Sequence, residues 1–290
     1  MAVTLCVYNL KGGIGKTAAS YNIASQLAMN GKKVLAIDGD RQQNLTQAFF
    51  ENIPDEQLTP TTDIFENGEL KEDVETLYHV LEENTNIYNA IRTVEYSTKR
   101  KLKNKFKKLE CKVDVLLGSK DMKYFACEDF ELLKEKLSVL QDEYDYIIID
   151  TPPNANVITM LYLIASDYVL IPMHLAKSSS IHAYNDVIEA VREARNDYGN
   201  ENLTILGSFY TAVQLYKSDQ LEEMNYCMSN EIRESMSLFK TAIRFDYAST
   251  QKTERTGKPL CVCCASTDIA NDYKNLVKEI EKKIKEEARA

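Results

Sequence analysis

A glycine-rich stretch near the amino terminus constrains the fold of this chain more than any other feature: Lys11-Gly12-Gly13-Ile14-Gly15-Lys16-Thr17. It follows a short apolar run at residues 3–8 and precedes a helix-like run at residues 18–29. Glycines let the backbone turn so tightly that successive N–H groups point inward, and the N-terminus of the next helix adds a partial positive charge. A strand, a glycine-rich turn and a helix in this order are typical of a phosphate-binding loop.

The two residues that end this stretch carry the expected chemistry. Lys16 is expected to reach the β- and γ-phosphates of a nucleotide, and the Thr17 hydroxyl to ligate Mg²⁺. The common pattern G-x-x-x-x-G-K-[ST] is not met, because Leu10 occupies its first glycine position, and a second lysine, Lys11, precedes the glycine pair instead. The alternative is a glycine-rich turn that binds nothing, which the strand–loop–helix context disfavours.

Two apolar runs end in aspartate. Residues 33–38 end at Asp38, which Gly39 and Asp40 follow, and the continuous apolar run 146–150 ends at Asp150. Ligands of open parallel sheets bind at the carboxyl ends of the strands. Asp150 is therefore expected at the Walker B position, where it would hold Mg²⁺. Capping of a following helix is the alternative role of these carboxylates.

The chain resembles ParA partition proteins, which belong to the ParA/MinD/nitrogenase-iron-protein group of P-loop ATPases. Residues 11–17 match their deviant Walker A form K-G-G-x-G-K-[ST], and residues 150–153 match D-x-P-P. Residues 38–46 are similar to D-x-D-P-Q-G-N-x-[ST], with Arg41 replacing proline and Gln43 replacing glycine. The resemblance covers nearly the whole chain. Alternating strands and helices favour an α/β fold, a doubly wound, mostly parallel sheet with helices on both faces.

The resemblance implies one P-loop ATPase domain over residues 1–290, with a less regular, partly basic insertion around residues 51–112. It implies ATP and Mg²⁺ as cofactors, with Lys11, Lys16 and Asp40 as catalytic residues. Lys11 of each subunit would reach the partner's nucleotide, and Asp40 would position the attacking water. The implied nucleotide-binding residues are Lys11, Gly12, Gly13, Ile14, Gly15, Lys16, Thr17, Ala18 and Pro259, and the implied metal-binding residues are Thr17, Asp38 and Asp150.

The implied function is partition of a plasmid, chromosome or mobile element. ATP would drive formation of a homodimer that binds DNA without sequence preference, and a ParB-like centromere-binding protein would stimulate hydrolysis. The alternatives are a MinD-like spatial regulator and an ATP-binding scaffold with weak or no hydrolysis, which Arg41 and Gln43 leave open. An electron-transfer ATPase is disfavoured because no cysteine occurs between Asp150 and Cys227. An N-terminal helix-turn-helix domain and operator binding are not expected.

The net charge of −9 means that any DNA contact must come from a local basic patch. One such patch is the run at residues 99–108, which is either a solvated face or loop or a phosphate-contacting arm. The resemblance places other DNA contacts in the C-terminal third, where ordinary solvated charge is the alternative. These candidates are Lys217, Arg244, Lys252 and Arg255.

Composition and patterning bound the remaining possibilities. No apolar stretch of about 18 or more residues occurs and no signal peptide is evident, so we expect a cytoplasmic protein, nucleoid-associated when ATP-bound. The seven cysteines do not have the spacing of a disulfide framework. Residues 261–264 are expected to form a short apolar strand, with metal ligation as the alternative, which the lack of a paired second cluster disfavours. The last helix has apolar residues at three- and four-residue spacing, which favours packing on the sheet over a membrane anchor.

Overall fold

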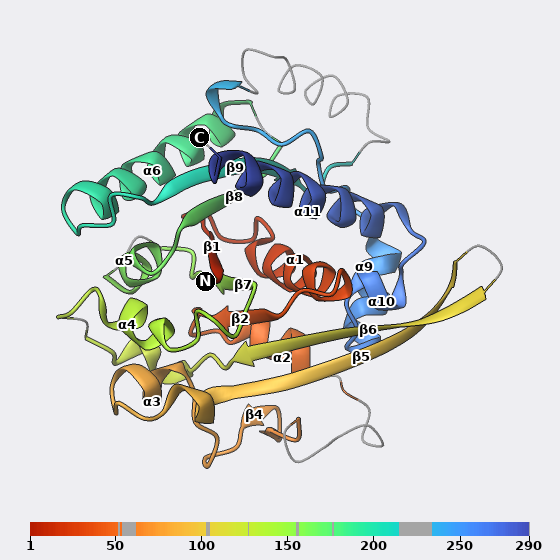
Figure 1. Ribbon diagram of the computed structural model, residues 1–290, viewed down its shortest axis with the longest axis horizontal. Coiled ribbons are helices and arrows are strands. Elements are labelled where there is room, and N and C mark those ends of the chain that lie inside the picture. The colour runs from red at the N-terminus through yellow and green to blue at the C-terminus, as the bar shows by residue number, and fades with distance from the viewer. Residues whose placement is uncertain are drawn as a thin grey trace.

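One β-sheet organises the computed structural model, which describes residues 1–51, 53, 62–102, 105–126, 128–154, 157–175, 177–214 and 234–289. For residues 99–102, 105–107 and 177–181 it describes the backbone alone. The sheet has seven strands in the order β5-β6-β2-β7-β1-β8-β9 (Figure 1). Their bounds are β1 Val3–Val7, β2 Val34–Asp38, β5 Ile91–Leu102, β6 Lys105–Leu116, β7 Tyr146–Asp150, β8 Tyr168–His174 and β9 Thr204–Thr211.

Neighbouring strands of this sheet are parallel, except that β5 and β6 form an antiparallel hairpin at its edge. Strands β2 and β7 are buried over their full length. That burial explains their continuous apolar sequences, since a parallel strand in the middle of a sheet is covered on both faces. The predicted fold class, a doubly wound and mostly parallel α/β sheet, is confirmed.

Helices cover both faces of the sheet (Figure 1). On one face α1, α2, α10 and α11 share an apolar core with the strands, and on the other face α3, α4, α5 and α6 do so. Helix α9 packs beside α10. The helices are α1 Lys16–Met29, α2 Asn44–Phe50, α3 Leu77–Leu81, α4 Leu132–Ser138, α5 Val157–Ile164, α6 Lys177–Asn196, α9 Tyr247–Thr256, α10 Leu260–Cys263 and α11 Asp268–Glu287, with 3-10 turns η2 Ile87–Ala90 and η3 Lys120–Lys123.

The segment between α2 and α3 contains a small two-stranded sheet of its own, β3 Phe65–Glu66 and β4 Glu69–Leu70, which pair antiparallel. Residues 99–102 and 105–108 of the basic run lie in the outer half of the β5–β6 hairpin. These residues form strands and not a loop, because each residue of β5 has a cross-strand partner in β6.

The strand expected at residues 261–264 is wrong. Leu260–Cys263 form the one-turn helix α10, and Pro259 is the residue that precedes its first turn. A short apolar run does not distinguish a buried strand from a buried helical turn, so the sequence pattern alone was ambiguous here.

Helix α11 packs against the sheet, as predicted, and against α1. Its apolar residues Tyr273, Leu276, Val277, Ile280 and Ile284 are all buried in the core shared with α1. Within the described ranges, none of the helices is both long and apolar enough to cross a membrane. The narrow apolar face of α11 is therefore already covered by the protein itself.

Candidate functional site

The phosphate loop connects the end of β1 to the start of α1. Gly13 and Gly15 have φ angles of 72° and 83°, which glycine adopts without the steric cost that other residues bear. The Thr211 hydroxyl donates to the Ile14 carbonyl at 2.8 Å, and the Asn9 amide donates to the Pro172 carbonyl at 2.9 Å. The ends of β8 and β9 thus hold the loop, and no acidic side chain lies in the first turn of α1 to repel an anion.

Lys16 supplies a buried positive charge inside this loop. Lys16 is only 7% exposed, and its Nζ donates to the carbonyls of Asn9 at 3.0 Å and Lys11 at 3.1 Å. Burial lowers the pKa of Lys16, and the negative charges of Asp150 and Asp40 partly oppose this shift. The present partners of the Lys16 ammonium are neutral carbonyls. A phosphate group bound in the loop would be a stronger partner, because it carries negative charge.

Asp150 lies at the end of β7, directly beside the first turn of α1. Its Oδ2 accepts from the Thr17 hydroxyl at 2.7 Å, and its Oδ1 accepts from the Ser20 hydroxyl at 2.9 Å. The carboxyl is fully buried, and desolvation followed by repulsion from Asp38 raises its pKa to about 7. The two hydroxyls counteract this shift without cancelling it.

Asp38 is the second buried carboxylate and is the cross-strand neighbour of Asp150 in the β2–β7 pairing. Its Oδ2 accepts from the Thr46 N–H at 2.7 Å, and its Oδ1 accepts from the Asp40 N–H at 3.3 Å. Burial raises the pKa of Asp38 to about 6, although these hydrogen bonds oppose the change. Adjacent parallel strands lie about 4.8 Å apart, so both carboxyl groups share one small, desolvated region.

These residues fit a magnesium ion. Two desolvated carboxylates side by side are costly unless a cation compensates them, and Mg²⁺ prefers oxygen ligands such as Asp150 and Thr17. Among the described residues, no three His, Cys, Asp or Glu side chains cluster as a protein-only metal site. An ion here would therefore take its remaining ligands from water and from oxygens of a bound phosphate.

The segment after β2 departs from the family pattern at Arg41 and Gln43. The backbone of Gln43 nevertheless adopts the conformation that favours glycine. Its φ is 59°, in the left-handed region, at the residue that precedes α2. Gln43 is held there because its Nε2 donates to the Gly118 carbonyl at 3.0 Å. Holding a side-chain-bearing residue in this conformation costs about 1 kcal/mol, so the substitution preserves the turn geometry at a modest price.

Asp40 and Gly39 lie at the same end of the sheet. Asp40 is buried, and its Oδ1 accepts from the Gln42 N–H at 3.0 Å. Gly39 donates its N–H to the Asp150 carbonyl at 2.9 Å and accepts the Tyr162 hydroxyl at 2.9 Å. A Cβ at Gly39 would lie 2.6 Å from that carbonyl oxygen and 2.7 Å from the Tyr162 ring. Only glycine allows the segment carrying Asp40 to lie this close to β7.

Arg41 is exposed and lines a cavity of about 440 Å³ together with Asp40. Pro152, Pro153 and Asn154, which follow β7, line the same cavity. The segments after β2 and after β7 therefore share one solvent-facing hollow. Lys11 is also exposed, and its N–H donates to the Asn9 side chain at 3.0 Å.

A second cavity, of about 410 Å³, adjoins the phosphate loop through Thr17 and Ala18. It lies among α1, α2, α9, α10 and α11. Pro259, the residue that the resemblance places beside adenine, is buried, and its neighbour Leu260 lines this cavity. The complete lining is Thr17, Ala18, Tyr21, Asn22, Asn44, Gln47, Ala48, Glu51, Thr250, Thr253, Glu254, Leu260, Ile269 and Tyr273.

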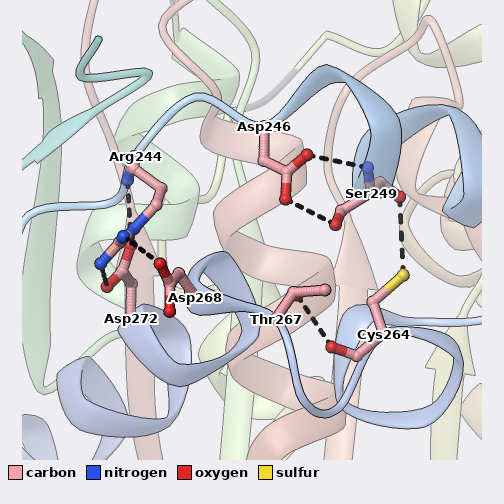
Figure 2. Close-up of polar contacts among 7 residues, drawn as sticks. All are labelled: Arg244, Asp246, Ser249, Cys264, Thr267, Asp268 and Asp272. Atoms are coloured by element: carbon pink, nitrogen blue, oxygen red, sulfur yellow. Dashed lines mark hydrogen bonds and ion pairs between the residues drawn. The ribbon is translucent and has the colours of Figure 1, made fainter. Parts of the chain in front are cut away.

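The candidate DNA-contacting residues have different surroundings. Arg244 donates to Asp272 through Nε at 2.7 Å and Nη2 at 2.9 Å, and to Asp268 through Nη1 at 2.7 Å (Figure 2). Its charge is thus compensated by two carboxylates of α11, which argues against a phosphate contact. Lys252 and Arg255 are exposed on α9. Lys217 lies outside the described residues.

Sequence reasoning missed three residues of the site. Ser20 holds the second oxygen of Asp150, Asn9 holds Lys16 through its carbonyl, and Tyr162 braces Gly39 from α5. Ser20 had a readable signal, because it lies three residues after Thr17 and therefore on the same helical face. Asn9 contributes a backbone carbonyl, which its residue type does not reveal, and Tyr162 acts through a contact 123 residues away in the chain, for which the local sequence gives no sign.

Residues 2–205 match the model of the family AAA_31, described as an AAA domain. The sporulation initiation inhibitor protein Soj of Bacillus subtilis (strain 168) is 25% identical to this chain in an alignment of 289 residues, which covers 97% of this chain and 98% of Soj. A structure of McdA from Cyanothece in complex with ATP aligns with a TM-score of 0.71 and 21% identity, covering 97% and 96% of the two chains.

A putative plasmid partition protein from Borrelia burgdorferi B31, solved with AMPPNP, aligns with a TM-score of 0.68 and 23% identity over 97% and 99% of the chains. At these identities the likeness to the solved structures establishes the fold.

Proposed function

Because this chain belongs to the AAA_31 family, and thereby to the ParA/MinD superfamily of P-loop ATPases, we propose that it is an ATPase for DNA partition. In this proposal Mg²⁺–ATP binding drives formation of a homodimer that binds DNA without sequence preference. A ParB-like protein on the cargo DNA stimulates hydrolysis and releases the dimer from the DNA. The protein is then nucleoid-associated in its ATP-bound form.

The contact of Thr17 and Ser20 with Asp150 carries this proposal most strongly. It joins the phosphate loop to the Walker B carboxylate at 2.7 and 2.9 Å, so that nucleotide phosphates and a metal would meet at one point. Bound Mg²⁺ would neutralise charge on the phosphates and on the buried carboxylates. Thr17 and Asp150 would hold the ion, Asp38 would support it from the neighbouring strand, and the loop from Gly12 to Ala18 would hold the phosphates.

Asp40 and Lys11 take the roles that phosphoryl transfer requires beyond binding. Asp40 is buried at the same end of the sheet as Asp150, where its carboxylate can orient a water molecule for in-line attack. Lys11 is exposed rather than buried, which suits a cation that serves the nucleotide of a second subunit. A cation at the β- and γ-phosphates offsets charge in the loose transition state, which would couple hydrolysis to dimerisation.

Two observations bear on the alternatives. The left-handed backbone at Gln43 keeps the turn that glycine would form, which supports an active ATPase over a scaffold without hydrolysis. The apolar face of α11 is buried in the core, which disfavours a MinD-like protein anchored to a membrane by that helix.

Nucleotide-binding and turnover assays test the proposal. Lys16→Ala should abolish binding of a fluorescent ATP analogue, whereas Lys33→Ala, outside the site, should leave it unchanged. Unaltered ATP affinity in Lys16→Ala would refute the phosphate-loop assignment. Asp40→Ala should bind ATP and accumulate as a dimer in size-exclusion chromatography, with turnover reduced by roughly 100-fold or more. Normal turnover in that variant would remove Asp40 from the mechanism.

A further inference from the structure

The outer half of the β5–β6 hairpin is the most basic element of an acidic protein. Residues 99–108 contain seven lysines and arginines and no acidic residue, while the whole chain has a net charge of −9. The rest of the chain therefore carries −16. The hairpin extends past α10 and away from the other helices (Figure 1), so the backbone of its outer half lies apart from the acidic body.

The charges of the cross-strand pairs change along this hairpin, from opposite in the inner half to like in the outer half. In its inner half, Glu95 lies opposite Lys112, and the two form an ion pair at 3.5 Å. In its outer half the register places Lys99 opposite Lys108 and Arg100 opposite Lys107. Opposite charges across a strand pair stabilise it, whereas like charges directly opposite each other destabilise it. Lys108 forms an ion pair with Glu110 of its own strand at 3.0 Å, but the like-charged cross-strand pairs of the outer half do not serve the stability of the hairpin.

Contacts of the inner half hold the hairpin in place despite this repulsion. Tyr96 and Cys111 are cross-strand partners and are buried. The Tyr96 hydroxyl donates to the Phe49 carbonyl at 3.2 Å, and the Cys111 thiol donates to the Ser25 carbonyl at 3.3 Å. These contacts fix the base of the hairpin to α1 and α2. The basic outer half is therefore available to bind an external anion while its base stays fixed.

We propose that residues 97–102 and 105–110 form an arm, the basic arm, that binds the sugar-phosphate backbone of double-stranded DNA. The inference rests on the DNA binding in the proposed function and identifies the element that provides it. Six residues of strand span about 20 Å, and a two-stranded ribbon of this kind fits the major groove, which is about 12 Å wide.

The composition of the arm favours phosphate contacts over sequence reading or membrane binding. Five of its six cations are lysines, which act as point charges, while bidentate recognition of guanine is a property of arginine more than of lysine. Phe106 is the single aromatic residue of the run 99–108, too little apolar surface for insertion into a lipid interface. DNA binding by the arm should therefore be insensitive to sequence and strongly dependent on salt.

Two matched variants test the arm. The arm variant carries Lys99→Gln, Arg100→Gln, Lys107→Gln and Lys108→Gln. The control variant carries Lys274→Gln, Lys278→Gln, Lys282→Gln and Lys285→Gln on α11, which changes the net charge by the same amount. Binding of a fluorescein-labelled 30-base-pair duplex of arbitrary sequence is measured by anisotropy with Mg²⁺–ATP present, between about 50 and 200 mM salt, the range where phosphate contacts dominate.

The parent and the control variant should bind alike, while the arm variant should lose more than about 100-fold in affinity at the lowest salt. The slope of log K against log salt should become shallower by about 3 to 4, since each lost phosphate contact removes about 0.9. ATP affinity and turnover without DNA should be unchanged in the arm variant. That readout separates the arm from the nucleotide site.

Three results would overturn the inference. If the arm variant binds DNA as the parent does, DNA contacts lie elsewhere and the proposed function survives. If the control variant loses as much affinity as the arm variant, net charge and not the arm is responsible. If the parent binds vesicles containing phosphatidylserine through the arm but does not bind the duplex, both the arm's assignment to DNA and the DNA step of the proposed function fail, while ATP binding stands.

Discussion

Replacing Asp150 with asparagine should stabilise the nucleotide-free protein at pH 8. The pKa of the buried Asp150 carboxyl is raised from 3.8 to about 7, so the folded protein binds a proton more tightly than the unfolded chain does. Between pH of about 4 and 7 the folded state holds more protons, and its stability falls as the pH rises through this window and levels off above it. The charge of Asp150 is thus a cost to folding at pH 8.

The magnitude follows from the size of that shift. A difference of about 3 pKa units, at about 1.4 kcal/mol per unit, gives roughly 4 kcal/mol at pH 8. Asparagine keeps one oxygen that accepts a hydrogen bond from Thr17 or Ser20, and loss of the other acceptor costs about 1 kcal/mol. The net gain expected for Asp150→Asn is therefore about 3 kcal/mol at pH 8, and near pH 4 only the loss of about 1 kcal/mol should remain.

Urea unfolding with EDTA and without nucleotide, at pH 5 and pH 8, measures this effect. The parent should lose stability between the two pH values, and Asp150→Asn should lose much less. Asp142→Asn is the matched control, because the Asp142 side chain is 93% exposed and should leave the parent's pH dependence intact. Equal pH dependence in the parent and Asp150→Asn, or a less stable Asp150→Asn at pH 8, would refute the reasoning.

Two further substitutions test contacts around the site. Gly39→Ala should lower the free energy of unfolding by about 2 kcal/mol, because its Cβ would lie 2.6 Å from the Asp150 carbonyl oxygen; an unchanged urea midpoint would contradict this. Arg244→Gln should cost about 1 kcal/mol, since Asp272 loses a bidentate partner, and should leave the salt dependence of DNA binding unaltered. A slope shallower by about 1 would instead identify Arg244 as a phosphate contact.

The sequence predicts this fold well where chemistry is local. The glycine-rich turn, the apolar run ending at Asp150 and the helical spacing of α11 each specify an element and its position, because periodicity and backbone requirements are written in adjacent residues. The same information brings Thr17, Asp38 and Asp150 to one sheet edge, since parallel strands end together.

What the sequence does not predict depends on partners far along the chain. The run 99–108 is rich in lysine, which has low β-propensity, yet residues 99–102 and 105–108 form strands because the inner pairs of the hairpin set their register. Arg244 resembles a free cation until Asp268 and Asp272 of α11 lie beside it. The turn at residues 260–263 is helical although its composition equally suits a strand.

The β5–β6 register also determines how this chain can vary in length. Each residue from Ile91 to Leu102 has one partner between Leu116 and Lys105, so removing the same number from both strands leaves every inner pair intact. An unequal deletion would shift the register, and a slip of one residue would turn Tyr96 away from the core. The hairpin can thus be lengthened or trimmed in whole cross-strand pairs while the contacts of Tyr96 and Cys111 with α2 and α1 stay as they are.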